Sequence, residues 1–315
     1  MIRLISQERN LNLCDPMKTK FKSIIRAACH SIGGVVCAAA VMLIASSAQA
    51  LNLVASSAGG TIYVFSSSGA QSTFASGLFD PEGLAFNSAG NLFVADYGNN
   101  AIQEFTPGGA QSTFASGVYY PEGLAFNSAG DLFVAAGGTR IYEFKPGGAQ
   151  STFASGLSNP IGLAFNSAGT LFEADYYSGN IYEFTPFGTR ITFASGLSYP
   201  QGLAFNSAGD LFVSDLVGGN IYEFTPGGAE TTFATGLNDP QGLAFDSVGD
   251  LFVATSVGNI YEFTPGGAET TFATGLTIPT FLAFGPVPVP EPSALGLLAV
   301  GAIALLVRRR RNLAA

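Results

Sequence analysis

The chain has 315 residues and no tryptophan, and its histidine, cysteine and methionine are confined to one end. The single histidine, His30, all three cysteines and all three methionines lie before residue 51. The rest of the chain therefore cannot form a disulfide, a thiolate nucleophile or a Ser-His-Asp triad. Zinc sites built on His or Cys, and haem ligation by His, Met or Cys, are excluded there for the same reason.

Charged residues are also scarce, at 11% of the chain, and they are unevenly distributed. Residues 51–288 hold 19 acidic and three basic residues, whereas both ends are basic. A body this acidic repels phosphate backbones, which excludes nucleic acid as a partner. The 40 glycines and the 47% hydrophobic content argue against a disordered polar chain and against a helical bundle.

Residues 1–50 are typical of a secretory signal peptide. A basic segment at residues 17–22 precedes an apolar stretch at residues 32–44, and Ala48-Gln49-Ala50 supplies a small-x-small cleavage pattern. Met17 is an alternative start, because residues 1–16 resemble no part of a signal. We expect export by the Sec machinery and cleavage by signal peptidase after Ala50. The alternative is a membrane anchor, which the short apolar stretch disfavours.

The C-terminus has three parts in a fixed order. Residues 286–293 form a proline-rich linker that contains Val289, Pro290, Glu291 and Pro292; residues 294–307 are apolar and predict a transmembrane helix; residues 308–315 begin with Arg308, Arg309, Arg310 and Arg311. Positive residues beside an apolar segment stay on the cytoplasmic side. A plain membrane anchor is the alternative interpretation.

This order resembles the PEP-CTERM sorting signal of exopolysaccharide-producing Gram-negative bacteria. The resemblance implies that an exosortase recognises the Pro-Glu-Pro segment and removes the helix. The protein would be anchored in the inner membrane in transit and would then reach the cell envelope or the extracellular matrix.

Between the two ends, one unit is repeated. Gly-Leu-Ala-Phe recurs at residues 83, 123, 162, 202 and 242, each time two residues after a proline, and a degenerate copy follows Pro279. The prolines are 39 or 40 residues apart, which is typical of a solenoid or a propeller. The copy at Pro200 predicts four strands, at residues 202–205, 211–214, 220–224 and 231–234. Since the second is apolar on both faces, we expect each sheet to lie between two others, as in a propeller blade.

The ends of the repeat region predict a closed ring. Residues 52–55, 61–65 and 72–75 match the second to fourth strands of a unit, and residues 281–284 match a first strand with nothing after it. Joining them completes one blade and leaves no free edge. The fold class is therefore all-β, a six-bladed β-propeller over residues 51–285. Its Pro-x-Gly-Leu-Ala-Phe, Asn/Asp-Leu-Phe-Val-Ala-Asp and Asn-x-Ile-x-x-Phe motifs resemble NHL repeats.

Comparison of the copies points to one variable face. The Asn-Ser-Ala-Gly and Thr-Pro-Gly-Gly turns barely change, whereas the loops of the opposite face vary. Six tyrosines lie in those loops: Tyr97, Tyr119, Tyr120, Tyr176, Tyr177 and Tyr199. Asp96, Asp175 and Asp215 share one loop position, which Ser56, Ala136 and Thr255 are expected to take in the other blades. Tyrosine suits sugars or peptides, so we expect a ligand-binding rim; loop drift, with tyrosine as filler, is the alternative.

The residue between proline and glycine is expected at the channel mouth, as Glu82, Glu122, Ile161, Gln201, Gln241 and Thr280. Glu82 and Glu122 with the three aspartates could bind Ca²⁺ or another divalent cation through oxygen. Similar hydrolases of the gluconolactonase and regucalcin type use a Glu/Asn/Asp metal site here, but Ile161 interrupts the ring. The alternative to a metal site is that the three aspartates only brace backbone turns.

Three functions compete on these observations. The leading hypothesis is an exported surface or matrix protein without catalytic residues or a cofactor, whose rim binds exopolysaccharide or another envelope component. The alternative is a metal-dependent lactonase or esterase that acts in the central channel. The third is a passive spacer that binds no ligand.

Overall fold

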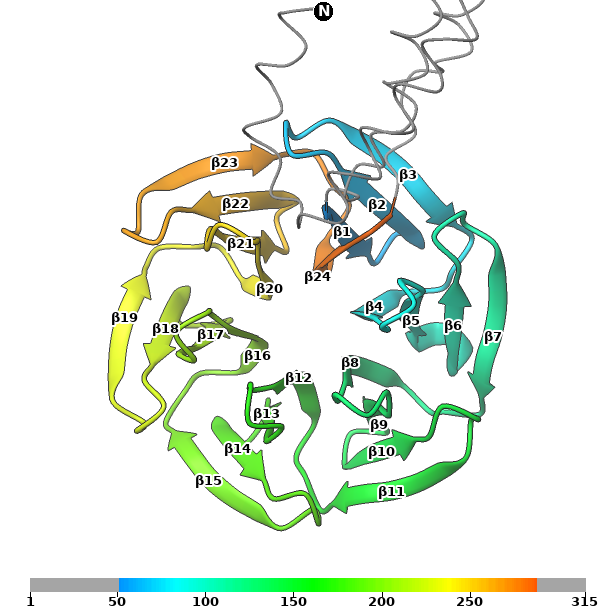
Figure 1. Ribbon diagram of the computed structural model, residues 1–315. Helices are drawn as coiled ribbons and strands as arrows, with labels where there is room; N and C mark the ends of the chain where they lie inside the picture. The colour runs from blue at the N-terminus through cyan, green and yellow to red at the C-terminus, as the bar shows by residue number, and fades with distance from the viewer. Residues whose placement is uncertain (1–50, 288–315) are drawn as a thin grey trace, which may run out of the picture. The chain divides into compact units, whose positions relative to one another are not determined.

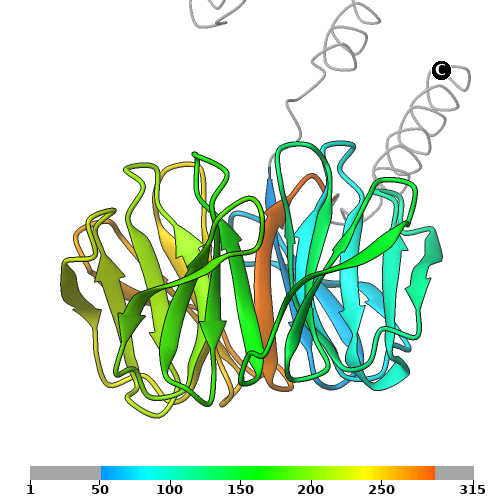
Figure 2. The same ribbon diagram turned by 90° about the horizontal axis from the view of Figure 1, so that it is seen from below.

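The structure is a computed structural model that describes residues 51–287. The residues form six four-stranded antiparallel sheets arranged as a ring around a central axis (Figure 1), and the strands run between the two faces of the ring (Figure 2). The predictions for the signal peptide and for the C-terminal helix and tail lie outside the described residues. Within residues 51–287, no helix is long and apolar enough to span a bilayer.

Each sheet is one blade. Blade 1 holds β24 (Pro279–Gly285), β1 (Asn52–Ser57), β2 (Thr61–Phe65) and β3 (Gln71–Ser76); blade 2 holds β4 (Pro81–Phe86), β5 (Leu92–Asp96), β6 (Ala101–Phe105) and β7 (Gln111–Ser116); blade 3 holds β8 (Pro121–Phe126), β9 (Leu132–Ala136), β10 (Arg140–Phe144) and β11 (Gln150–Ser155). Blade 4 holds β12 (Pro160–Phe165), β13 (Leu171–Asp175), β14 (Asn180–Phe184) and β15 (Arg190–Ser195); blade 5 holds β16 (Pro200–Phe205), β17 (Leu211–Asp215), β18 (Asn220–Phe224) and β19 (Glu230–Ala234); blade 6 holds β20 (Pro240–Phe245), β21 (Leu251–Thr255), β22 (Asn259–Phe263) and β23 (Glu269–Ala273). A 3-10 turn, η2 (Tyr97–Asn99), follows β5.

The composite blade is confirmed. β24 pairs with β1 in antiparallel register, so that Leu53 lies opposite Phe284 and Asn52 opposite Gly285. The side-chain amide of Asn52 also donates to the Val287 carbonyl at 2.7 Å. The first and last strands of the propeller therefore satisfy each other's backbone groups, and the ring has no open junction.

The core lies between the blades. Six clusters of buried apolar side chains each span two adjacent sheets. The second strands β5, β9, β13, β17 and β21 are buried at every residue, as expected for sheets packed on both sides. Phenylalanine fills these interfaces: Phe133, for example, meets the rings of Phe153 and Phe165 edge-on at 4.9 and 5.0 Å. Buried T-shaped pairs add to the energy of burial.

Two kinds of short turn close one face of each blade, which we call the turn face. In the first kind, the Asn87 side-chain oxygen accepts from the backbone of Ala89 and Asn91. In the second, the Thr106 hydroxyl accepts from the backbone of Ala110. Both turns place a glycine at positive φ, Gly90 and Gly109. These bonds explain why the turn sequences repeat, and they assign the turns a structural role.

The opposite face, which we call the rim face, carries the loops between second and third strands and the loops before each proline. The first strands begin at the proline on this face, two residues earlier than predicted. The prediction that Ser56 takes the aspartate position is wrong: Ser57 lies opposite Pro279, as Asp96 lies opposite Pro81. β1 has one more residue at its start than β5, so Leu53 and not Asn52 corresponds to Leu92, which moves the equivalence by one.

Candidate functional site

The channel mouth on the rim face is formed by the second residue of each first strand. As predicted, Glu82, Glu122, Ile161, Gln201, Gln241 and Thr280 line one cavity of about 300 Å³. Ala58, Asp80, Tyr97, Ile278 and Phe281 complete its wall. All six blades contribute, so the cavity exists only because the ring closes.

A glycine in five of the six first strands sets how closely the strands meet around the axis. A Cβ atom at Gly123 would collide with the Ile161 carbonyl oxygen of the next blade, and one at Gly202 would collide with the Gln241 carbonyl oxygen. The same holds at Gly83, Gly162 and Gly242. In β24 the equivalent residue is Phe281, which lines the cavity. Five of the six junctions at the mouth are therefore backbone-to-backbone contacts.

The acidic groups of the mouth lie on neighbouring blades 2 and 3, and burial is the main cause that raises the pKa of each. Burial, then the charges of Glu122 and Asp80, raise the pKa of Glu82 well above its usual value, with the Thr280 hydroxyl acting in the opposite direction. Burial and Asp80 raise the pKa of Glu122 to about 7. Burial also raises the pKa of Asp80. The mouth therefore holds negative charge at an energetic cost.

Five of the six predicted rim tyrosines gather in two clusters, each of which bridges adjacent blades. Tyr97 and Tyr120 lie with their ring centroids 5.2 Å apart. Tyr176 lies 5.1 Å from Tyr177 and 4.8 Å from Tyr199. Tyr119 is exposed and belongs to neither cluster. Burial, followed by the charges of Glu122 and Glu82, raises the pKa of Tyr97, which places the first cluster beside the acidic side of the mouth.

The backbone before each proline is left-handed in every blade, a feature that sequence reasoning missed. Asp80, Asn159 and Asp239 are of residue types that tolerate this region, but Tyr120, Tyr199 and Ile278 also adopt it, with φ of 47°, 63° and 41°. Bulky or β-branched residues are strained there. The sequence marks this position only by the repeated proline that follows it. A residue before proline ordinarily favours extended backbone, so the proline does not predict a left-handed conformation.

The three predicted aspartates lie beneath the rim rather than on it, each no more than 3% exposed. Their carboxylates accept hydrogen bonds from the backbone of the loop before the proline: Asp96 from Phe79 at 2.8 Å, Asp175 from Ser158 at 2.7 Å and Asp215 from Ser198 at 3.1 Å. They brace the loops around Tyr97, Tyr176 and Tyr199, whereas blade 3 has Ala136 at this position. Asp96 also accepts from the side chains of Asn99 and Gln103.

The donor set at the mouth does not fit a divalent metal. Among residues 51–287, no three His, Cys, Asp or Glu side chains are grouped as metal ligands. Asp96, Asp175 and Asp215 each accept from a backbone amide, and the residue next to Glu122 around the mouth is the apolar Ile161. Ca²⁺ takes six to eight oxygen ligands.

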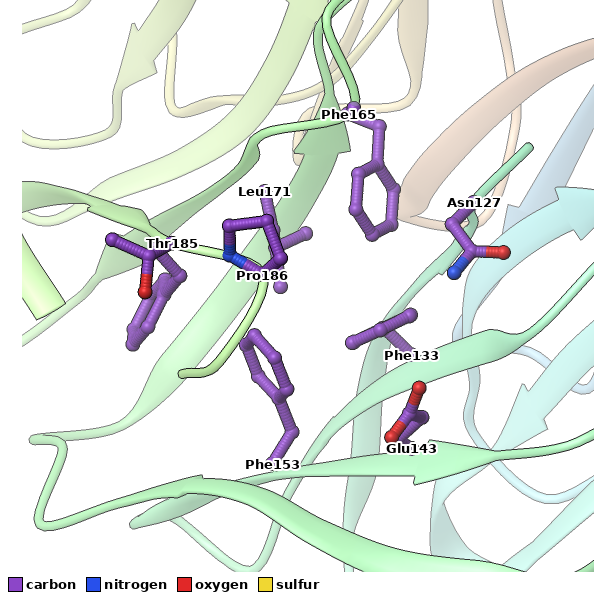
Figure 3. Close-up of a pocket in the computed structure, with 10 residues that line it drawn as sticks. Asn127, Phe133, Glu143, Phe153, Phe165, Leu171, Thr185 and Pro186 are labelled. Atoms are coloured by element: carbon purple, nitrogen blue, oxygen red, sulfur yellow. The ribbon is translucent and has the colours of Figure 1, made fainter. Parts of the chain in front are cut away.

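A smaller hollow of about 100 Å³ opens on the turn face between blades 3 and 4 (Figure 3). Its walls are mainly rings and apolar side chains, including Phe133, Phe153, Phe165 and Leu171. The carboxylate at its edge, Glu143, is paired with Lys145 at 2.8 Å. The hollow is therefore a packing gap between sheets and offers no convergent polar groups.

Comparisons with known proteins agree with this architecture. The PEP-CTERM protein-sorting motif matches residues 288–311, which include Val289, Pro290, Glu291, Pro292 and the four arginines, and the NHL repeat matches residues 80–105. The chain carries both features. The sorting motif suggests export to the envelope of a Gram-negative bacterium and processing by an exosortase-type partner. Among curated protein sequences, none matches the chain significantly.

Solved structures share the fold at low sequence identity. A streptogramin B lyase is 16% identical, with a TM-score of 0.62, over 76% of this chain and 85% of its own. A chain of a nidogen/laminin complex is 20% identical, with a TM-score of 0.68, over 74% of this chain and 98% of its own. A gluconolactonase from Xanthomonas campestris is 16% identical, with a TM-score of 0.59, over 75% and 92%. At these identities the likeness shows the fold alone.

Proposed function

We propose that this NHL-repeat propeller with a PEP-CTERM motif is a binding protein of the cell envelope or extracellular matrix, whose rim tyrosines bind polysaccharide. It would be exported by the Sec machinery, cleaved by signal peptidase after Ala50 and sorted by an exosortase. The observation that carries the proposal is the strained backbone of Tyr120 and Tyr199. Asparagine at the same position, as in Asn159, avoids that strain. The strain therefore argues against the alternative that these tyrosines arose by loop drift.

The geometry of the rim supports a sugar ligand. Tyr120 and Tyr199 are exposed, yet each is held against another ring by a neighbouring blade. Pre-ordered aromatic faces with polar tips bind flat apolar faces and hydroxyl groups at a low entropic cost. The Asp215 carboxylate holds the Tyr199 loop at Ser198, and the Asn100 side-chain oxygen accepts from the Tyr120 backbone at 2.9 Å, so both rings stand on braced loops before a ligand arrives.

Replacing Tyr120 and Tyr199 together by asparagine is expected to weaken polysaccharide binding by about tenfold, since each lost aromatic contact contributes about 0.5–1.5 kcal/mol. The same double variant should be at least as stable as the parent, because asparagine tolerates left-handed backbone. Binding is measured with the full chain on a glycan array and by titration, and stability by thermal unfolding.

Phe187→Ala is the matched control. Phe187 is 95% exposed but lies in a turn-face loop, so its removal should leave binding unchanged. Unchanged binding by the Tyr120/Tyr199 variant would show that the rim tyrosines are not the binding site. A loss of stability in that variant would show that the two tyrosines are not strained.

The lactonase alternative rests on the fold alone. Gluconolactonases are among the similar structures, but this chain is only 16% identical to the one from Xanthomonas campestris. The mouth offers the Glu82 and Glu122 carboxylates without a set of metal ligands. No further observation on residues 51–287 favours hydrolysis over binding.

A further inference from the structure

The mouth cavity is polarised across the channel. Its acidic half is formed by Glu82 and Asp80 of blade 2 and Glu122 of blade 3. The other half is neutral and presents Ile161, Gln201, Gln241 and Thr280. Since the six first strands are otherwise nearly equivalent, the side chains alone create this asymmetry.

No basic residue of the propeller neutralises the acidic half. Residues 51–287 hold three cations, and each is engaged elsewhere. Lys145 pairs with Asp131 and Glu143, Arg140 donates to the Tyr142 hydroxyl, and Arg190 donates to the Gly156 carbonyl and stacks on Tyr182. The cavity lining contains no Lys, Arg or His.

An aromatic wall stands beside the same acids. Tyr97 lines the cavity, and its ring is in contact with that of Tyr120. Ring faces attract cations as well as apolar sugar faces. The cavity of about 300 Å³ is at the small end of ligand pockets, so it suits a single small ring rather than a folded partner.

We propose that the mouth binds the protonated primary amine of an amino sugar, with the amine between Glu82 and Glu122 and the sugar ring against Tyr97 and Tyr120. This inference rests on the proposed function and names the class of polysaccharide. An ammonium group brings three hydrogen-bond donors and one positive charge to carboxyls that have no cationic partner. The carboxamides of Gln201 and Gln241 face it with groups that hydrogen-bond sugar hydroxyls.

The test compares three β-linked hexamers, of glucosamine, N-acetylglucosamine and glucose, titrated into the full chain at pH 6.5 and low salt. We expect the glucosamine hexamer to bind at least tenfold more tightly than the other two. Glu82→Gln with Glu122→Gln should reduce its affinity about tenfold and leave the other two unchanged. Gln201 and Gln241 already occupy this register, so the variant is compatible with the fold.

Glu230→Gln with Glu269→Gln is the matched control, since it replaces the same two carboxyl groups by carboxamides on the exposed outer strands, where blades 2 and 3 carry Gln111 and Gln150. It should leave all three affinities unchanged. Equal binding of the acetylated and free-amine hexamers overturns the amine inference and leaves the proposed function intact. An equal loss in the control variant overturns the inference in favour of nonspecific attraction. Failure of all three hexamers to bind overturns both.

Discussion

Gly123→Ala is expected to destabilise the propeller by about 3 kcal/mol or more, or to prevent folding, because the new methyl group has no space. Gly123 lies in β8, and its Cβ would overlap the Ile161 carbonyl oxygen in β12 of the next blade. Residues on both sides of the contact are paired within their own sheets, Pro121 and Leu124 in β8 and Pro160 and Leu163 in β12, so neither strand can move aside without opening an interface between blades. The measurement is the free energy of unfolding in urea.

Gly147→Ala is the matched control for this prediction. Gly147 is exposed in a turn between β10 and β11, its φ is not positive, and nothing lies within 4 Å of a Cβ placed there. Its substitution should change stability by no more than about 0.5 kcal/mol. If Gly123→Ala is as stable as Gly147→Ala, the close approach of the first strands is not what sets the width of the channel.

The repeat itself made most of the fold predictable. A period of 39 or 40 residues, with four β-like runs in each, defines the blade, and the strand missing at one end is found at the other. Membership of the channel mouth was also predictable, because the residue after each proline occupies the same register in every copy. Because each structural position occurs once in every blade, comparing the copies shows which residue types that position accepts. A sequence without repeats gives only one residue for each position.

Features that depend on the distance between blades were not predictable. The repeated glycine marks a close approach, but the sequence does not say that the neighbour is a carbonyl oxygen one blade away. The left-handed residue before each proline contradicts the local preference for extended backbone at that position. Ser57 was missed as the aspartate equivalent because blade 1 is assembled from two ends with no continuous copy to align.

Glu173 breaks the pattern of the repeat at a position that the structure shows to be in the core. It lies in the middle of β13, where the equivalent residues are Val94, Val134, Val213 and Val253. It is fully buried, and neither carboxyl oxygen has a hydrogen-bond partner. Burial, followed by repulsion from Asp175, raises its pKa well above the usual value, and Arg190 only partly offsets this.

Glu173→Val is therefore expected to stabilise the protein by about 1–3 kcal/mol at pH 4, where the acid is neutral in both states, because a buried polar group without a partner is removed. The gain should grow as the pH rises above 4.5, since the unfolded glutamate ionises while the folded one retains its proton. A raised pKa in an acid thus removes stability with increasing pH, up to the folded pKa, beyond which the loss is constant.

Glu173→Gln separates the two contributions to this gain. The amide cannot ionise, so the growth in relative stability above pH 4.5 should match that of Glu173→Val, whereas the constant gain at pH 4 should be absent because the amide is still buried without partners. Urea unfolding of the parent and both variants at pH 4 and pH 8 measures this. Equal stability of all three proteins at pH 8 would mean that Glu173 is not buried as an unpaired acid, and blade 4 would then pack on blade 3 differently from the other interfaces.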